Sequence, residues 1–232
     1  MGNAEGPFRT EDDEVCATFL RAYTDVSGLI LFGRGWRRTW GETHIVLDLG
    51  VGGFTLVVKN GGFTQVNPAA NRVLIKALLQ LGEFDVSQTV IECYSWGGNL
   101  SLPIAAHSRK LFGIEQDANA IADARDNSAR LGLQNVEFIH ASAQTGLETL
   151  LRRNVQADVV VLDPPRAGAV EILKAISQLG ATKIVYVSCD PTTLARDLRR
   201  LGQNGYRVES LQPIDFFPQT YHVETIAVAV LT

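Results

Sequence analysis

From about Thr89 onward, short runs rich in β-branched residues alternate with helical stretches, and this alternation constrains the fold more than any other feature. The runs are TVIEC, KLFGIE, VEFIHA, DVVVLD and KIVYVS, and the stretches are 99–108, 118–131, 146–153, 170–179 and 191–201. Such an alternation indicates a parallel sheet flanked by helices. The nearly continuous apolar character of DVVVL and KIVYV is typical of strands that are covered on both faces.

The end of the chain departs from this alternation. YRVESLQPI and HVETIAVAVL follow each other without an intervening helix, so we expect an antiparallel strand pair at the sheet edge. A parallel sheet closed by such a pair is similar to the fold of S-adenosylmethionine-dependent methyltransferases. The predicted fold class is therefore α/β, with a doubly wound, mostly parallel sheet and an antiparallel C-terminal strand pair.

The first third of the chain is less regular and predicts a small α+β part. We expect a helix over residues 10–23 and strands at LILFG, THIVLDL and FTLVVK. Asn67-Pro68 supplies an N-cap and a proline at the first helical position, which predicts a helix to about Leu81. We therefore divide the chain into an N-terminal segment, 1–82, whose last helix leads into the core, and a catalytic domain, 83–232.

The composition, 46% hydrophobic and 20% charged, is typical of a globular protein. The chain has no apolar run of roughly 18 residues and its start is acidic, so we expect no membrane span, no signal peptide and a cytoplasmic location. Three scattered cysteines, four histidines and no CxxC predict neither a disulfide framework nor a zinc or iron–sulfur site. The net charge of −4 does not favour nucleic-acid binding, although arginines cluster at positions 34, 37 and 38.

Two glycine clusters compete for the role of a cofactor loop. VLDLGVGG is followed by β-rich residues and opens no helix, so we interpret it as a turn between two strands. VIECYSWGGNLSLPIA ends a strand at Glu92, turns at Gly97 and Gly98, and begins a helix near Asn99. The next strand ends at Glu115, where a carboxylate can accept the hydroxyl groups of an adenosine ribose. This order of elements favours the second cluster.

The fourth strand ends in DPPR, from Asp163 to Arg166. Two consecutive prolines have a fixed φ and no N–H, so they form a rigid, extended turn. That turn lies at the sheet edge where ligands bind in open α/β folds. The alternative is a simple end of the strand, for which one proline would suffice.

The stretch KIVYVSCDPTTLARDL places Cys189 between a strand and an Asp190-Pro191 pair suited to begin a helix. The positive end of the helix would then face the thiol. Cysteines in such positions titrate well below the free value of about 8.5, which predicts a reactive thiolate. The alternative is that Cys189 is a small core residue.

Glu224 begins the last strand and shares its face with Ile226, Val228 and Val230. Because this strand is antiparallel, its start lies at the same sheet edge as the ends of the parallel strands. The topology therefore predicts that Glu92, Asp163, Cys189 and Glu224 lie along one rim. The alternative is a glutamate that caps an edge strand in water.

Together, these segments resemble the catalytic domain of the RNA uracil-5-methyltransferase family. The segments are FTQVNPAANRVL, ECYSWGGNLSLPIA, LDPPRAG, SCDPTTLARDL and HVETIAV, and the likeness covers roughly residues 60–232. The resemblance implies S-adenosylmethionine as cofactor, S-adenosylhomocysteine as product, and no metal. It implies an RNA substrate, rRNA or tRNA, in which a uridine becomes 5-methyluridine.

The resemblance also assigns roles to individual residues. Cys189 matches the nucleophile that adds to carbon 6 of uracil, and Glu224 matches the base that removes the proton from carbon 5. Apart from the resemblance, we expect Arg166 to bind the substrate, by positioning the uracil or polarising one of its oxygens. Several residues match cofactor-binding positions: Gln65, Tyr94, Gly98, Asn99, Glu115 and Asp163.

The sequence departs from the family pattern in two respects. Trp96 stands where the family has the first glycine of its loop. Neither the N-terminal RNA-binding barrel nor the cysteine-ligated iron–sulfur cluster of many relatives is evident, so a protein partner or second subunit could supply RNA affinity. Two alternatives stay open: a non-catalytic RNA-binding relative with a degenerate cofactor site, and a methyltransferase for another substrate.

Overall fold

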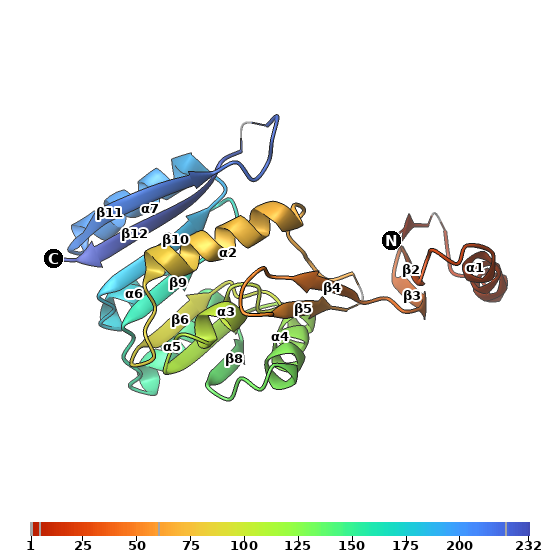
Figure 1. Cartoon of the computed structure of the whole chain (residues 1–232), viewed down its shortest axis with the longest axis horizontal. Helices are drawn as coiled ribbons and strands as arrows, with labels where there is room; N and C mark the ends of the chain where they lie inside the picture. Colours follow the sequence, from red (N-terminus) through yellow and green to blue (C-terminus); the bar gives the residue numbers. More distant parts are fainter. Residues whose placement is uncertain (1, 5, 60, 221) are drawn as a thin grey trace.

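The computed structural model, which describes residues 2–4, 6–59, 61–220 and 222–232, confirms the predicted α/β fold (Figure 1). A seven-stranded sheet has the order β11-β12-β10-β9-β6-β7-β8. Strands β6 to β10 run parallel, and β12 is antiparallel to both of its neighbours. The strands are β6 Thr89–Cys93, β7 Lys110–Glu115, β8 Val136–His140, β9 Val159–Leu162, β10 Lys183–Ser188, β11 Tyr206–Ile214 and β12 Glu224–Leu231.

Both faces of the sheet are covered by helices, as the apolar strands predicted. In β10, Ile184 and Tyr186 face one core, and Val185 and Val187 face the other. The first core is formed with α5 Ala143–Arg152, α6 Leu173–Gln178 and α7 Pro191–Gln203, and the second with α2 Pro68–Gly82 and α3 Ser101–Ala105. Helix α4, Ala118–Arg130, packs on β8 through residues including Ile121. Each fully buried leucine or isoleucine contributes roughly 2 kcal/mol by leaving water.

Three predicted helices differ from the observed ones at their ends. Ser142 accepts a hydrogen bond from the Thr145 N–H, so α5 begins three residues before the predicted start at Gly146. Helices α3 and α6 are shorter than predicted, since the residues flanking them, including Asn99 and Val170, lie in turns and loops. The side-chain cap of Ser142 therefore sets the start of α5, which hydrophobic periodicity alone did not locate.

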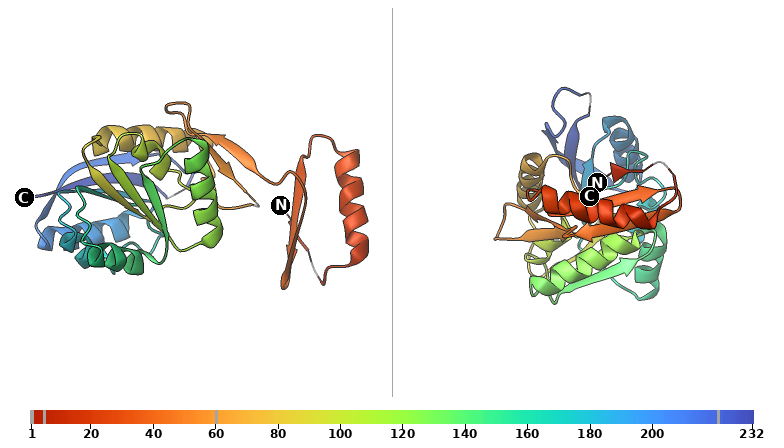
Figure 2. Two further views of the ribbon diagram at one scale, coloured as in Figure 1. Left: turned by 90° about the horizontal axis from the view of Figure 1, so that it is seen from below. Right: turned by 90° about the vertical axis from the view of Figure 1, so that its right-hand side faces the viewer.

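The N-terminal part consists of two pieces. Strands β1 Gly2–Asn3, β2 Gly28–Gly33 and β3 Trp36–Gly41 form a small sheet beside α1 Thr10–Ala22, away from the large sheet (Figure 2). The sequence did not predict β3, because WRRTWG lacks an apolar alternation. The hairpin of β4 Ile45–Asp48 and β5 Thr55–Val58 shares the core of α2 and α3. The boundary at residue 82 stays a prediction.

The first glycine cluster is a turn between strands, as predicted. Strands β4 and β5 are antiparallel, and the Leu49 N–H donates to the Phe54 carbonyl to close the hairpin. Gly50, Gly52 and Gly53 have positive φ, which only glycine adopts readily. This cluster therefore does not open a helix and does not form a cofactor loop.

Asp197, on α7, is fully buried and connects three segments. Its carboxylate accepts from the Ala169 N–H at 2.7 Å, the Tyr186 hydroxyl at 2.8 Å and the Arg196 Nε at 2.8 Å. Asp197→Ala leaves buried donors unpaired, so we expect the free energy of unfolding to fall by about 3 kcal/mol in urea titrations. Arg199→Ala, an exposed change on the same helix, serves as the control. A loss no larger than in that control would contradict the predicted role.

Candidate functional site

The topology brings the predicted chemical groups to one end of the sheet. Ser188 of β10 pairs with Thr225 of β12 in the antiparallel register. Cys189 comes directly after Ser188 and Glu224 directly before Thr225, so both residues lie next to the same strand pair. The Asp163 N–H donates to the Cys93 carbonyl at 3.4 Å, which ties the end of β9 to the end of β6. Charge interactions connect Glu224 with Asp163 and with Cys189. The predicted rim is therefore present, and Glu224 is buried on it rather than exposed to water.

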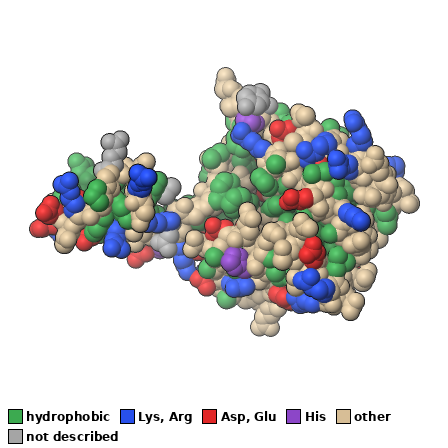
Figure 3. Space-filling view, turned by 180° about the vertical axis from the view of Figure 1, so that it is seen from behind, with side chains coloured by type: hydrophobic (Ala, Val, Ile, Leu, Met, Phe, Trp, Pro, Cys, Tyr) green, Lys and Arg blue, Asp and Glu red, His purple; other side chains and the backbone are tan. Residues whose placement is uncertain are grey.

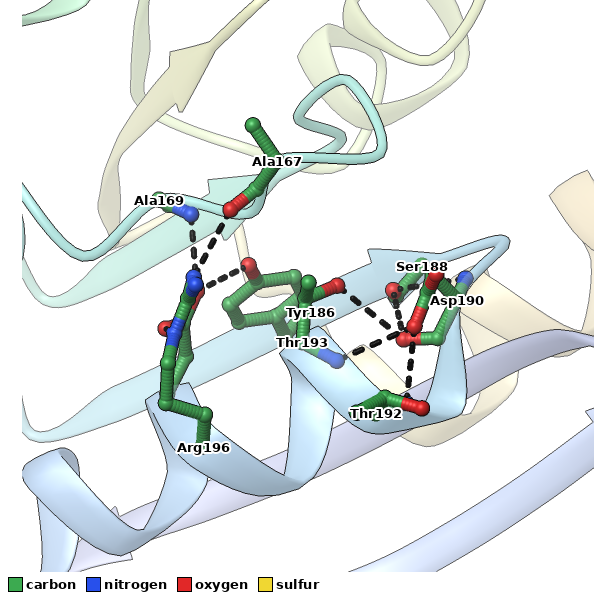
Figure 4. A network of polar contacts seen from close by, with 9 residues as sticks. Ala167, Ala169, Tyr186, Ser188, Asp190, Thr192, Thr193 and Arg196 are labelled. Carbon is green, nitrogen blue, oxygen red and sulfur yellow. Dashed lines mark hydrogen bonds and ion pairs between the residues drawn. The ribbon is translucent and has the colours of Figure 1, made fainter.

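Cys189 is half-buried, so it is not the fully enclosed core residue of the alternative interpretation. The predicted helix follows it: the Asp190 carboxylate caps α7 by accepting from the N–H groups of Thr192 at 2.8 Å and Thr193 at 3.0 Å (Figure 4). This cap places a negative charge at the helix N-terminus and uses its free N–H groups. The helix end is thus less available to stabilise a thiolate than the sequence suggested.

The prediction of a depressed thiol pKa is wrong. Burial raises the pKa of Cys189, and the carboxylates of Glu224 and Asp163 raise it further. Arg166 acts in the opposite direction, because its positive charge favours the thiolate. The thiol is therefore neutral in the isolated protein at pH 7, and its activation depends on surrounding charges.

Three carboxyl groups at this end of the sheet have raised pKa values. Burial raises the pKa of Glu224 to about 7. Burial, with a contribution from Glu224, raises the pKa of Asp163 to about 8. Burial also raises the pKa of Glu92 well above its usual range, although the Ser101 hydroxyl donates to its carboxylate. Glu224 is thus close to half ionised at neutral pH, as suits a group that accepts and releases protons.

Glu115 lies at the end of β7, as predicted for a ribose-binding acid. Its Oε1 accepts from the backbone N–H groups of Gln116 at 2.7 Å and Asp117 at 2.8 Å, and its Oε2 from that of Trp96 at 3.1 Å. A carboxylate has about four acceptor positions, so about one stays free. Beside Glu115 lies a cavity of about 220 Å³ whose lining includes Tyr94 and Pro165. A mixed apolar and polar lining next to a fixed acceptor suits a nucleoside.

A second cavity, much narrower, contains most of the other predicted cofactor residues. Its free volume is about 10 Å³, and its lining includes Gln65, Ser95, Asn99 and Asp163. The Ser95 hydroxyl is buried there without a hydrogen-bond partner among the described residues. An orphaned buried hydroxyl is costly, which indicates that a polar group of a ligand belongs in this cavity.

Trp96 explains why this cavity is narrow. Its ring stacks on Phe63, with centroids 4.3 Å apart and planes inclined by 29°. Both rings line the narrow cavity. Gly98, which matches the family loop, has φ of 97° and donates its N–H to the Ser95 carbonyl at 3.0 Å, so it forms the turn. The bulky residue in the loop therefore narrows the cavity, one of the roles that the sequence left open for it.

Two residues of the site, His222 and Asn71, were missed by sequence reasoning, whereas their partners Arg166 and Asn99 were predicted. Arg166 is exposed and lies 3.0 Å from His222, Nη2 to Nε2, which connects the DPPR turn to the segment before Glu224. Asn71 of α2 pairs with Asn99 through their side-chain amides. The motifs HVE and FTQVNPAAN contain these residues, but only their contacts reveal a role.

The described parts of the chain offer neither a metal site nor a membrane span. Within these ranges, no group of three or more His, Cys, Asp or Glu side chains is placed to hold a metal ion. None of the described helices is both long and apolar enough to cross a bilayer.

Known proteins of similar sequence agree with the predicted resemblance. A family profile described as tRNA (Uracil-5-)-methyltransferase matches residues 39–230. An uncharacterized RNA methyltransferase of Halalkalibacterium halodurans is 38% identical over 200 residues, which cover 86% of this chain and 43% of the relative. One from Caldanaerobacter subterraneus is 42% identical over 166 residues, covering 71% of this chain and 37% of the relative. The chain thus spans less than half the length of these relatives.

Two solved structures illustrate the likeness of the fold. Pyrococcus abyssi tRNA (uracil-54, C5)-methyltransferase, in complex with S-adenosyl-L-homocysteine, is 27% identical with a TM-score of 0.73, over 91% of this chain and 53% of that one. Precorrin-6y C5,15-methyltransferase of Geobacter metallireducens is 18% identical with a TM-score of 0.57, over 68% of this chain and 88% of that one. The second likeness concerns the fold alone.

The charges around Cys189 predict how its alkylation depends on pH. Because burial and Glu224 raise its pKa, iodoacetamide should modify Cys189 with a midpoint above the free-thiol value of about 8.5, measured by peptide mass spectrometry. Glu224→Gln should lower this midpoint, and Arg166→Ala should raise it. Glu209→Gln, an exposed change on β11, is the matched control for Glu224→Gln. A midpoint below the free-thiol value would contradict the expected rise in the pKa of Cys189.

Proposed function

Since the chain belongs to the tRNA (uracil-5-)-methyltransferase family, as its motifs predicted, we propose that it methylates carbon 5 of a uridine in RNA, rRNA or tRNA, by way of a covalent cysteine adduct. S-adenosylmethionine, when bound, supplies an electrophilic methyl group on a sulfonium. The observation that carries the proposal is the meeting of a half-buried thiol, Cys189, with a buried carboxyl group, Glu224, at one end of the sheet.

The proposed chemistry requires both groups. Carbon 5 of uracil is too weak a nucleophile to be methylated unaided. When the Cys189 sulfur adds to carbon 6, the electrons of the double bond move into an enolate and make carbon 5 nucleophilic. After methylation, carbon 5 still carries its proton. Glu224 accepts that proton, the carbon–sulfur bond breaks, and the sulfur leaves with its electron pair.

The electrostatics of the site support these roles. The pKa of Glu224, about 7, lets it take up a proton from carbon 5 and release it to water between turnovers. The Cys189 thiol must lose its proton before or during attack, and Arg166 favours that loss. Arg166 is therefore proposed to favour the Cys189 thiolate by its positive charge and also to bind the substrate.

The residues present suit the proposed cofactor. The cavity of about 220 Å³ beside Glu115 suits the adenosine part, with Tyr94 in its wall. Gln65, Asn99 and Asp163 suit the charged methionyl end, together with the Ser95 hydroxyl, which has no partner in the part of the chain that the structure describes. The turn at Gly98 lets the backbone approach it. The narrow cavity must widen for that end to enter, which requires Phe63 and Trp96 to separate.

A larger cleft offers a path for RNA. It measures about 890 Å³, lies between β3 and α4, and reaches Trp96 and Gly97. Arg37 and Arg38 line one wall, and Figure 3 shows basic, acidic and apolar side chains mixed on the N-terminal part. Arginines beside aromatic rings suit single-stranded nucleic acid. Aspartates of α4 line the other wall, so we propose that a protein partner or second subunit adds RNA affinity.

The stack of Trp96 on Phe63 favours a second candidate, a non-catalytic RNA-binding relative whose cofactor site is closed. In that case S-adenosylhomocysteine would not bind. Cofactor binding therefore separates the two candidates.

The adduct is testable with 5-fluorouridine RNA. Because fluorine cannot leave as a proton does, incubation with RNA and cofactor should accumulate a covalent complex at Cys189, seen in denaturing gels and by peptide mass spectrometry. Cys189→Ser should abolish the complex. With ordinary RNA, Glu224→Gln should lower turnover by about a hundredfold or more, in line with the loss of a general base. The absence of any adduct with tRNA and rRNA fragments would count against the proposal.

The closed cavity predicts a gain of cofactor affinity. Trp96 holds φ of 47°, a region costly for a bulky residue, and Trp96→Gly removes both this strain and the ring. Calorimetry should show S-adenosylhomocysteine binding about tenfold tighter, equivalent to roughly 1.4 kcal/mol. Trp36→Gly, in the N-terminal sheet, is the control and should leave affinity unchanged. Weaker binding by Trp96→Gly would mean that the indole holds the cofactor instead.

A further inference from the structure

The loop between β6 and α3 is fastened to helix α2 by a reciprocal pair of amides. Asn71 Nδ2 donates to Asn99 Oδ1 at 2.8 Å, and Asn99 Nδ2 donates to Asn71 Oδ1 at 2.9 Å. Asn71 is only 4% exposed. A buried amide that loses its partner leaves a donor and an acceptor unsatisfied, so this two-bond pair is a strong constraint on the position of Asn99.

The loop needs such a constraint because its backbone is strained. Tyr94 has φ of 67°, Trp96 of 47° and Gly98 of 97°, so three of five consecutive residues are left-handed and two of these are bulky. Each bulky residue in this region costs roughly 1–2 kcal/mol. Without external contacts, the loop would relax to another conformation.

Backbone N–H groups fasten the first half of the loop to β7. The N–H groups of Tyr94 and Ser95 donate to the Ile114 carbonyl, and that of Trp96 donates to Glu115. On the other side of the turn at Gly97 and Gly98, the side-chain connection is the amide pair of Asn99. The loop is therefore fixed at both ends, first by β7 and then by α2.

Helix α2 is a firm support for this pair. Asn67 caps the helix by accepting from the Ala70 N–H at 3.1 Å, and Leu74, Ile75 and Leu78 are buried in the core. Asn67 Nδ2 also donates to the Phe216 carbonyl at 3.3 Å, on the segment that leads to Glu224. The start of α2 thus contacts both the cofactor loop and the segment before the proposed base.

We propose that Asn71 is a positioning residue, which holds Asn99 and the turn at Gly97 and Gly98 in the conformation that accepts S-adenosylmethionine. This inference rests on the proposed function, because it concerns the same cofactor. Asn71 acts through Asn99. One N–H and one lone pair of the Asn99 amide remain for the ligand after the pair has formed.

Calorimetry with S-adenosylhomocysteine tests the inference without RNA. Asn71→Ala and Asn99→Ala should each weaken binding by about tenfold or more, as expected when a buried amide loses its partner. The double variant should bind no worse than Asn99→Ala, because Asn71 acts only through Asn99. Asn71→Asp keeps one of the two hydrogen bonds and should lie between wild type and Asn71→Ala. It also serves if the alanine variant folds poorly.

Asn127→Ala is the matched control. Asn127, on α4, is 1% exposed and likewise pairs reciprocally, with the N–H and the carbonyl of Val57 at 2.9 and 2.8 Å, and its Oδ1 also accepts from Arg130 Nη2 at 3.0 Å. Its loss should lower stability in urea titrations as much as Asn71→Ala does. It should leave affinity for S-adenosylhomocysteine within about twofold of wild type, since it does not reach the loop.

Hydrogen exchange separates failure of the inference from failure of the proposed function. If wild type binds S-adenosylhomocysteine and Asn71→Ala binds it equally well, the inference is overturned and the proposed function stands. If wild type does not bind, the proposed function fails, and exchange of the amides in 94–100 decides the inference. Faster exchange there in Asn71→Ala than in Asn127→Ala supports a positioning role, and equal rates refute it.

Discussion

The antiparallel pairing of β12 with β10 is the constraint on which the site depends. In a wholly parallel sheet, every strand would present its carboxyl end to the ligand edge, and the start of the last strand would lie at the opposite edge. Because β12 enters between β10 and β11 in the reverse direction, its first residue, Glu224, lies beside the end of β10 and Cys189. Two groups far apart in sequence thereby share one site.

This arrangement has an electrostatic cost. Carboxyl groups whose pKa is raised on folding bind protons more tightly in the folded state than in the unfolded state. Their contribution to stability is present at low pH and is lost as the pH rises from ordinary carboxyl pKa values of about 4 toward the folded pKa values of about 7 for Glu224 and about 8 for Asp163. The fold thus keeps two carboxyl groups whose pKa values lie near neutral pH, and it does so at a cost in stability. Such shifted pKa values are common at catalytic sites.

The loop after β6 shows a similar compromise. Trp96 adopts a conformation that favours glycine, and its ring reduces the cavity that suits the cofactor. Contacts with Phe63 and Glu115 hold Trp96 in this conformation, and Asn71, through Asn99, fixes the turn that follows it. The loop is therefore fixed by its surroundings rather than by its own sequence, and separation of the two stacked rings is the change that would admit a ligand.

The sequence by itself determined those elements of the fold that depend on interactions between residues close together in the chain. Features that depend on neighbouring residues were predicted. They are the alternation of strands and helices, the helix starts at Asn67-Pro68 and Asp190-Pro191, and the turn at Gly52 and Gly53. Strand β3 was not predicted, since it is defined by pairing with β2. The tertiary structure alone decided the raised pKa of Cys189, the stack on Trp96 and the Asn71 pair, because burial and contacts between distant residues exist only after the chain has folded.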